Sequence, residues 1–392
     1  MKLDFYLSEM SVTDLHGGGL TLQRIIGDDL MHIDHFAHVS RMATDLPIIA
    51  KLKNRSIDLG SFWDGNKARA VLGNTFARSV SRMPFIVKKT AKNAARVLSG
   101  KFERDQAVKG LICPQGIISI YTLEVLKRYR PVKYVTWIMD DHLVKYINGE
   151  WCYPKGIEQV FNKHLREADH VFVISTVMQD FYYSRFGVKS TVLFGPADWV
   201  GKCDYPIINP GSMLKIGYFG AVTSWQLDAL IHVSRALSSK NIQLHIYSGI
   251  KKLPEAIDME GVQLKKYISP NQVLTTMKTY DGILLPMSFL EKERHMTAFN
   301  IATKMSEYLA SGIPILAVGP EYAAMMKYLK LNNAAILVET CTGEAVEDDF
   351  KLFYNQQYIT EILSNARNLA INETGILPMR KRWLDGVNKL IS

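Results

Sequence analysis

Short apolar runs of strand length alternate with helix-like segments through almost the whole chain. In the first half, the strand-like runs cover residues 2–7, 110–114, 133–139, 171–174 and 191–194. In the second half, they cover residues 214–219, 242–247, 262–267, 281–286, 313–318 and 334–338. Strands that alternate with helices pair in parallel and are covered by helices on both faces. The pattern therefore predicts an α/β protein with two Rossmann-like parallel-sheet domains that face each other across a crevice.

The length of the chain agrees with two domains. It has 392 residues, of which 47% are hydrophobic, and this exceeds what one ordinary core contains. The alternating pattern breaks at residues 195–198 and again at 206–211, where glycine and proline interrupt it. We expect an N-terminal domain of residues 1–197, a C-terminal domain of residues 198–375 and a closing helical segment of residues 376–392.

The cysteines and the apolar runs exclude several classes of protein. The four cysteines are far apart in the sequence and form no CxxC pair, so neither a zinc ribbon nor a disulfide framework is indicated. No uninterrupted apolar run reaches the roughly 18–20 residues of a membrane-spanning helix. Asp4 interrupts the very short apolar run at the N-terminus, which is unlike a signal peptide. We expect a folded protein of a reducing, cytoplasmic compartment.

Positive charge is concentrated in one segment. The chain has a net charge of +9, and residues 51–110 contain 14 Lys/Arg and 4 Asp/Glu, a difference of +10. Within this basic segment, residues 84–98 form an amphipathic helix pattern whose cations lie largely off the apolar stripe. Two interpretations stay open: a solvated helix face, or a patch that docks a peripheral protein on the anionic inner face of the cytoplasmic membrane. Nucleic acid is disfavoured, because neither interleaved aromatic residues nor a binding motif accompanies the patch.

Residues 303–320 predict a short helix, a glycine stop and a buried strand. Gly312 supplies the left-handed residue after the helix, and residues 313–318 form the apolar run. Lys304 and Glu307 are three residues apart, so they lie on one face of the first turns. A cation, the unbonded N–H groups of a helix start and a carboxylate can bind the diphosphate and the ribose of a nucleotide. The alternative is an ordinary surface Lys–Glu pair.

Glycines and acids also follow strand-like runs in the first half. Gly17 and Gly18 lie between the first strand and a helix, where glycine lets a backbone approach a phosphate closely. The alternative there is a simple turn. Asp140, Asp141 and His142 directly follow the third strand-like run, at the sheet edge where α/β proteins bind ligands. They are therefore the catalytic candidates of the first half, and the alternative is an aspartate that caps the next helix.

No metal site is predicted. His32, His35 and His38 lie in a stretch expected to form the second strand, and its alternation places His35 on the opposite face from the other two. Three ligands on two faces of a strand do not converge on one ion. We expect neither a metal nor a cofactor.

Several of these landmarks resemble one family of enzymes. Residues 304–316 closely resemble the donor-site signature of GT-B-fold glycosyltransferases. The closest kin look like the large retaining family that builds bacterial cell-surface polysaccharides (glycosyltransferase family 4-like). The loop at 17–18 resembles the N-terminal glycine loop of that family, residues 168–175 its strand before the linker, and residues 216–221 the first strand and phosphate loop of its donor domain. The landmarks span residues 15–320 in the order of the family.

The resemblance implies roles for residues of the second half. Glu307 would bind the ribose hydroxyls of a nucleotide sugar. Lys304 and Thr303 would hold the diphosphate, with Gly220 and Ala221 opposite them. The closing helix would cross back to the N-terminal domain.

Other positions carry a weaker likeness or depart from the family. Tyr267 and Ile268 would contact the base. The usual motif has a glutamate eight residues before Glu307, where this chain has Phe299 beside Asn300. The arginine that often follows the phosphate loop is also absent, and Arg294 or His295 would replace it. Asn300 and Arg294 are therefore included among the donor-binding candidates.

The implied activity is transfer of a sugar from a nucleotide-diphosphate sugar to a glycan or lipid-linked glycan. It would serve the synthesis of a bacterial surface polysaccharide such as lipopolysaccharide or capsule, with retention of configuration and without a metal. Asp140, Asp141 and His142 would line the acceptor side and deprotonate or orient the acceptor hydroxyl, with His142 or Asp141 favoured over Asp140 for this role. Two other interpretations stay open: a nucleotide-sugar epimerase of the same fold, and a non-catalytic homologue that binds nucleotide sugars.

Overall fold

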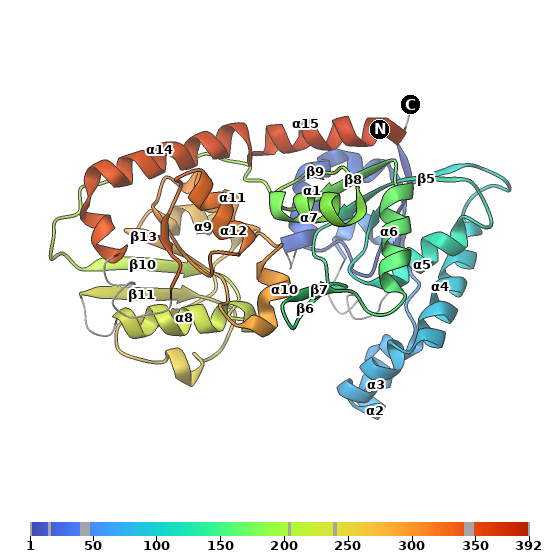
Figure 1. Ribbon diagram of the computed structural model, residues 1–392, viewed down its shortest axis with the longest axis horizontal. Helices are drawn as coiled ribbons and strands as arrows, with labels where there is room; N and C mark the ends of the chain where they lie inside the picture. The colour runs from blue at the N-terminus through green and yellow to red at the C-terminus, as the bar shows by residue number, and fades with distance from the viewer. Residues whose placement is uncertain are drawn as a thin grey trace. The chain divides into compact units, whose positions relative to one another are not determined.

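The computed structural model describes residues 2–14, 17–39, 48–202, 205–237, 241–340 and 349–390 (Figure 1). The chain divides into two compact units. Unit 1 comprises Met1–Gly195 and Met379–Ser392, and unit 2 comprises Pro196–Pro378. Each unit contains a parallel sheet connected by helices, so the predicted α/β class with two parallel sheets is confirmed.

The described part of unit 1 contains a seven-stranded parallel sheet in the order β3-β2-β1-β4-β5-β8-β9. Its strands are β1 Leu3–Ser8, β2 Ile33–His38, β3 Ser56–Asp58, β4 Val108–Cys113, β5 Val132–Ile138, β8 His170–Val173 and β9 Thr191–Val192. The strand order reverses between β1 and β4, and sheets of this type bind ligands outside the carboxyl ends of the strands at the reversal. The residues after Ser8 and Cys113 therefore mark the ligand edge of unit 1.

Helices and a small hairpin complete unit 1. The helices are α1 Gly17–Ile26, α2 Asn66–Leu72, α3 Asn74–Ser81, α4 Pro84–Ser99, α5 Ile117–Leu126, α6 Ile157–Glu167, α7 Thr176–Phe186 and α15 Ile376–Val387, which begins at the boundary with unit 2. The antiparallel hairpin pairs β6 Lys145–Ile147 with β7 Glu150–Cys152. His32 ends a short 3-10 helix before β2, so the expectation that it lies in the strand is wrong. Among the described residues, no helix is long and apolar enough to cross a membrane.

The amphipathic helix of the basic segment is confirmed as α4. Its apolar stripe is buried, and Ala94 and Leu98 pack in the same core cluster as Leu123 of α5. Lys88 and Lys92 lie on the exposed side. Most of the stripe is therefore occupied by the core of unit 1, and the side of α4 that is available to other molecules is mainly charged, with Phe85 and Val97 as its exposed apolar side chains.

Unit 2 contains, in its described residues, a six-stranded parallel sheet in the order β12-β11-β10-β13-β14-β15. Its strands are β10 Leu214–Phe219, β11 Ile242–Tyr247, β12 Val262–Lys265, β13 Gly282–Pro286, β14 Ile315–Val318 and β15 Ile336–Val338. Its helices are α8 Ser224–Leu237, α9 Pro270–Met277, α10 Arg294–Thr297, α11 Lys304–Ser311, α12 Ala324–Leu331 and α14 Gln356–Asn372. In the numbering of this unit alone the order is 3-2-1-4-5-6, that of a dinucleotide-binding sheet, with its reversal between β10 and β13.

The stretch from α11 to β14 folds as its sequence predicts. Gly312 ends the helix with a φ of 76°, in the left-handed region that glycine adopts without a steric penalty. All four residues of β14 are buried. The polar sequence of residues 288–300 is typical of a loop, but the segment contains the short helix α10 and buries residues 296–300.

The closing helix α15 packs on the sheet of unit 1. Trp383 is 1% exposed, and its ring centroid lies 5.2 Å from that of Phe172 and 5.9 Å from that of Trp137. One turn later, a Cβ atom added to Gly386 would lie 2.3 Å from the ring of Phe172. Glycine at this position therefore lets the helix approach the strand closely.

Truncation of this aromatic contact should destabilise the protein. We expect Trp383→Ala to lower the free energy of unfolding by about 3–5 kcal/mol, because it removes a buried aromatic side chain and leaves a cavity. Leu384→Ala is the matched control, since Leu384 lies on the same helix but is 41% exposed, and its effect should stay within about 0.5 kcal/mol. Urea unfolding of both variants measures the difference. Equal effects would show that the helix is held elsewhere.

Candidate functional site

In unit 2, Lys304 and Gly220 come together at the carboxyl edge of the sheet. Gly220 directly follows β10, and Lys304 begins α11. A Cβ atom added to Gly220 would lie 1.9 Å from Nζ of Lys304, so the ammonium group occupies the space that any other residue at 220 would need. Two residues 84 positions apart, which the resemblance placed on opposite sides of a diphosphate, are thus in direct contact.

Tyr218 contacts both Lys304 and the loop that follows Gly220, and it is not among the site residues predicted from the sequence. Nζ of Lys304 lies 5.5 Å from the centroid of the Tyr218 ring, a distance that allows a cation–π interaction. The Tyr218 hydroxyl donates a hydrogen bond to the carbonyl oxygen of Ala221. In the sequence, Tyr218 is an aromatic residue two positions before the glycine. Aromatic residues are common in strands, so this position alone did not indicate a role in the site.

The backbone N–H group of Gly220 already has a hydrogen-bond partner within unit 2. It donates to the carbonyl oxygen of Tyr247 at 2.9 Å, so Gly220 contributes space rather than a donor. Helix α8 begins at Ser224, four residues later, and α11 begins at Lys304 itself. Thr303 is exposed and makes no side-chain cap to α11. Helix starts carry N–H groups and a positive dipole end that suit an anion.

The electrostatic state of Lys304 also suits an anion. Burial lowers the pKa of Lys304 from its usual 10.5 to about 8, and the negative charge of Glu307 partly opposes this effect. A desolvated ammonium group gains most from an anionic partner, because little water competes for it. Lys304 is therefore prepared to bind a negatively charged ligand such as a diphosphate.

Glu307 is placed by the same helix. It is half-buried in the first turn of α11. The next residue fixes the helix against the sheet, since the hydroxyl of Tyr308 accepts a hydrogen bond from the backbone N–H of Phe219 at 3.3 Å. A carboxylate one turn from Lys304, on a helix tied to β10, is consistent with a ribose ligand. That role stays a prediction.

The other predicted donor-binding residues lie in different surroundings. Tyr267 and Ile268 follow β12 at the carboxyl edge, and the Tyr267 side chain is 69% exposed. Asn300 is buried, with 8% of its surface exposed. Arg294 is already engaged, because its guanidinium stacks 4.1 Å from the ring centroid of Tyr322 and forms an ion pair with Glu291 at 3.3 Å.

At the position where the family has a glutamate, this chain has Phe299, and the surroundings of that side chain are buried. Phe299 is 2% exposed and belongs to the buried segment that follows α10. A buried phenylalanine cannot accept hydrogen bonds from sugar hydroxyls. The group that recognises a donor sugar must therefore be another residue.

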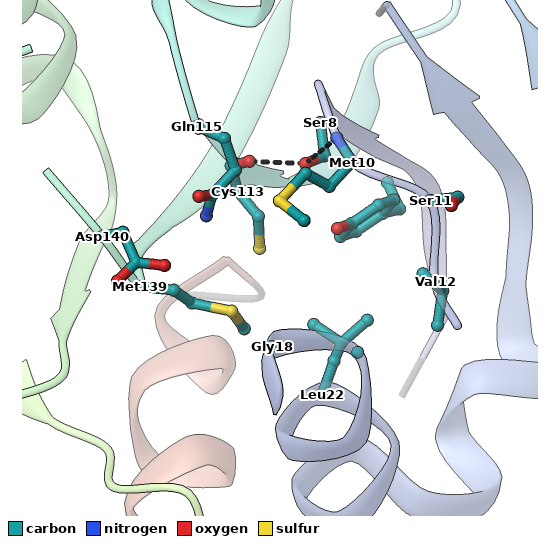
Figure 2. Close-up of a pocket in the computed structure, with 12 residues that line it drawn as sticks. Ser8, Met10, Ser11, Val12, Gly18, Leu22, Cys113, Gln115, Met139 and Asp140 are labelled. Atoms are coloured by element: carbon teal, nitrogen blue, oxygen red, sulfur yellow. Dashed lines mark hydrogen bonds between the residues drawn. The ribbon is translucent and has the colours of Figure 1, made fainter. Parts of the chain in front are cut away.

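Unit 1 has a pocket at the reversal between β1 and β4 (Figure 2). The side chains of Met10, Leu22, Cys113 and Met139 point toward its interior, and Asp140 borders it. Asp140 lies two residues after the end of β5, at the carboxyl edge where the sequence placed it. The pocket therefore combines apolar side chains with polar ones, which are Ser8, Ser11, Gln115 and the carboxylate of Asp140.

Glycines at the start of α1 form another wall of the pocket. Gly17 begins the helix, and Gly18 and Gly19 line the pocket. A Cβ atom added to Gly19 would lie 1.9 Å from the carbonyl oxygen of Thr13, so close packing requires a glycine at this position. The sequence analysis selected Gly17 and Gly18 and missed this requirement, which only the neighbouring backbone creates.

Burial separates the functions of the two aspartates. Asp141 is 3% exposed and its carboxylate accepts four hydrogen bonds, from the N–H groups of Leu143 and Val144 at 3.0 and 3.1 Å and from the hydroxyls of Tyr153 and Tyr182 at 2.9 Å each. Such a carboxylate holds the chain after β5 in place. The structure thus gives Asp141 a positioning role.

Asp140 is better suited to proton transfer. It is half-buried and borders both the pocket described above and a second one lined by His142. Burial, followed by the negative charge of Asp141, raises the pKa of Asp140 from 3.8 to about 7. A carboxyl group with a pKa near neutrality can accept or donate a proton at physiological pH. His142 is exposed at the rim, and its role stays a prediction.

Two further buried side chains shape the pocket of unit 1. Glu9 accepts hydrogen bonds from the N–H groups of Gln115 and Ser119, each at 2.8 Å, and from the Ser119 hydroxyl at 2.9 Å. His38 donates from Nδ1 to the carbonyl oxygen of Met10 at 3.1 Å. Burial lowers the pKa of His38 to about 4, so it is neutral at physiological pH. Both residues directly follow or end a strand, a signal that the sequence analysis did not use.

The geometry of both units fits the GT-B class. No protein-family model and no curated protein sequence matches the chain. Solved structures do match, and they are GT-B glycosyltransferases. At identities below one quarter the likeness establishes the fold alone, so the chain has the GT-B fold.

Three of these structures illustrate the likeness. HepE from Anabaena, in complex with UDP and glucose, is 12% identical with a TM-score of 0.61, over 98% of this chain and 99% of HepE. WaaB, a lipopolysaccharide outer core galactosyltransferase, is 13% identical with a TM-score of 0.62, over 99% of both chains. S. aureus TarM, in complex with UDP, α-GlcNAc-glycerol and fondaparinux, is 15% identical with a TM-score of 0.55. That match covers 76% of this chain but only 59% of TarM.

The two aspartates should respond differently to substitution. Asp140 has a higher pKa folded than unfolded, so the wild type loses stability as pH rises from about 4 to about 7. We expect Asp140→Asn to remove this loss, so that its melting temperature relative to the wild type rises between about pH 5 and pH 8. Asp141→Ala should instead lower stability at both pH values, by about 3 kcal/mol at pH 5, because it leaves buried donors without an acceptor. Thermal unfolding at both pH values measures this, and similar behaviour of the two variants would contradict the assignment.

Proposed function

We propose that the protein is a glycosyltransferase that transfers a sugar from a nucleotide-diphosphate sugar to a glycan or lipid-linked glycan. Unit 2 would bind the donor and unit 1 the acceptor. The observation that carries the proposal is the half-buried Lys304 ammonium packed against Gly220 at the strand reversal, with Glu307 one turn later. A diphosphate would contact the first and a ribose the second.

The chemistry follows from the charge that develops on the leaving group. Cleavage of a sugar–phosphate bond places negative charge on the departing diphosphate, and donors fixed around it lower the barrier. Lys304 would supply a cation, while the starts of α8 and α11 would supply N–H groups. We propose that the reaction needs no metal ion for this reason. Retention of configuration is proposed from the sequence resemblance.

On the acceptor side, Asp140 would accept or orient the proton of the attacking hydroxyl. Its pKa of about 7 means that a substantial fraction is ionised at physiological pH. Asp141 would hold the backbone of this segment, and His142 would contact the acceptor from the rim. Met10, Leu22 and the glycines at the start of α1 would form the surface against which the acceptor packs.

The structural neighbours support the choice of substrates. HepE and TarM are described with UDP, and WaaB is a lipopolysaccharide galactosyltransferase. We therefore propose UDP as the nucleotide and a bacterial surface polysaccharide, of the lipopolysaccharide or capsule type, as the product. The protein would work in the cytoplasm at the inner membrane face, with the exposed cations of α4 near anionic lipids.

Nucleotide binding tests the donor site. UDP and UDP-sugars should raise the melting temperature by mass action, more than ADP or GDP does. Lys304→Ala should weaken UDP binding by about 10- to 100-fold, since it removes a charge-assisted contact worth about 1.5–3 kcal/mol. Glu307→Ala should weaken it as well. Lys327→Ala, an exposed lysine of α12, is the matched control and should bind normally.

The same panel distinguishes the alternatives. UDP-sugars incubated with glycan acceptors should yield the transferred product. An epimerised sugar formed without acceptor would favour the epimerase interpretation, and tight binding without any turnover would favour a non-catalytic homologue. Unchanged UDP affinity in both Lys304→Ala and Glu307→Ala would contradict the proposed location of the donor site.

The affinity for UDP should depend on pH in a defined direction. Lys304 has a pKa of about 8 without ligand, and a bound diphosphate raises it by favouring the charged form. Affinity should therefore fall as pH rises above about 8, with binding accompanied by proton uptake. Calorimetry in buffers of different ionisation enthalpy detects the uptake. Lys304→Arg, which stays charged, should lose this dependence, whereas a pH profile shared by the wild type and the arginine variant would contradict it.

A further inference from the structure

Large apolar side chains are exposed around the turn between α2 and α3. Val71, Leu72 and Phe76 are 82%, 39% and 58% exposed, and they flank Gly73, which joins the two helices. Figure 1 shows α2 and α3 extending from unit 1 beyond the start of α4. We refer to Val71, Leu72 and Phe76 as the α2–α3 tip. A cluster of this kind marks an interaction site more often than an isolated exposed residue does.

The exposed side chains of the tip are distinct from the side chains that α2 and α3 bury. Ala68 of α2 and Ala77 of α3 are 1% and 0% exposed, so each helix already buries another position. Further exposed apolar side chains lie close in sequence, with Met83 and Phe85 at the start of α4 being 41% and 64% exposed. Seven of the nineteen large apolar side chains that the described residues expose fall between positions 62 and 97. Exposed apolar side chains are therefore enriched in this part of the chain.

Exposed cations follow the tip closely in the sequence. Exposed cations in and just before α4 are Arg82, Lys88, Lys89, Lys92 and Arg96. None of these five takes part in an ion pair within the described part of the chain. With the difference of +10 over residues 51–110, the surface carries uncompensated positive charge. It is complementary to an anionic partner.

We propose that the α2–α3 tip inserts into the interfacial layer of an anionic lipid bilayer while the cations of α4 contact the headgroups. Apolar side chains flanked by lysine and arginine bind such membranes by combining burial with electrostatic attraction. A protein partner fits less well, because lysine is depleted in protein–protein interfaces. A nucleic acid fits less well, because Val71 and Leu72 cannot stack on bases.

This inference deepens the membrane part of the proposed function and changes its mechanism. The sequence suggested α4 as the docking helix, but its apolar stripe is buried in the core of unit 1. The apolar contribution therefore comes mainly from the tip, together with the exposed Phe85 at the start of α4, and the remaining exposed side of α4 contributes mostly charge. Because membrane binding requires neither donor nor acceptor, it can be tested apart from the glycosyl transfer.

Flotation of the full-length protein with lipid vesicles tests the proposal. Without nucleotide, the wild type should float with phosphatidylcholine vesicles that contain phosphatidylglycerol, and much less with phosphatidylcholine alone. The triple variant Val71→Ser, Leu72→Ser and Phe76→Ser should lose at least about tenfold in partitioning. The matched control is Leu331→Ser with Ile371→Ser, at exposed apolar positions of unit 2 that are 86% and 47% exposed.

A second pair of variants tests the electrostatic part. Lys88→Glu with Lys89→Glu should weaken flotation and reduce its dependence on salt, since fewer cations contact the headgroups. Lys251→Glu with Lys252→Glu, at exposed positions of unit 2, makes the same change in net charge and should have little effect. Circular dichroism and the UDP-induced thermal shift show that each variant is folded.

Several results would overturn the proposal. These are the absence of flotation, flotation that does not change in the triple variant, or equal losses in the tip and control variants. Sedimentation that shows a wild-type dimer and a monomeric triple variant, with neither bound to vesicles, would assign the tip to a contact between copies instead. Failure of UDP binding with intact flotation would reject the proposed function and leave the membrane surface standing.

Discussion

The packing of the Lys304 ammonium against Gly220 is the contact on which the candidate donor site of unit 2 depends. Gly220 at the end of β10 leaves the space that the ammonium group occupies, the ring centroid of Tyr218 lies 5.5 Å from the cation, and α11 starts at Lys304 itself. The same contact removes water from the ammonium group and lowers its pKa to about 8. An anionic ligand at this position would favour the charged form of Lys304 and so oppose the effect of burial.

In unit 1, two adjacent carboxyl groups have different surroundings. Both residues follow the end of β5. The carboxylate of Asp141 accepts hydrogen bonds from four donors, whereas Asp140 borders the pocket. The bonded carboxylate fixes the backbone, and its charge helps to raise the pKa of its neighbour to about 7. Structural support and the proposed proton chemistry are thus divided between consecutive residues, because the carboxylate of Asp141 is already occupied by four hydrogen-bond donors.

The basic segment shows how one pattern can have several structural outcomes. The apolar stripe of α4 is real, but it packs in the core, and the exposed apolar side chains lie instead at the turn before it. Periodicity identifies which side chains share a face of a helix. It does not identify whether that face meets the protein, a lipid or water, because this depends on elements distant in the sequence.

The sequence by itself determined the α/β class, the two parallel sheets, the helix–glycine–strand unit from Lys304 to Val318 and the position of Asp140 at a strand end. These follow from local periodicity, turn chemistry and the fixed direction of parallel strands. Tertiary structure alone decided that Gly220 provides space and not a donor, that Asp141 is fully hydrogen-bonded, that close packing requires a glycine at Gly19 and that Phe299 is buried. Each of these depends on a neighbour many residues away, and desolvation and steric contact are properties of the folded surroundings that no local pattern encodes.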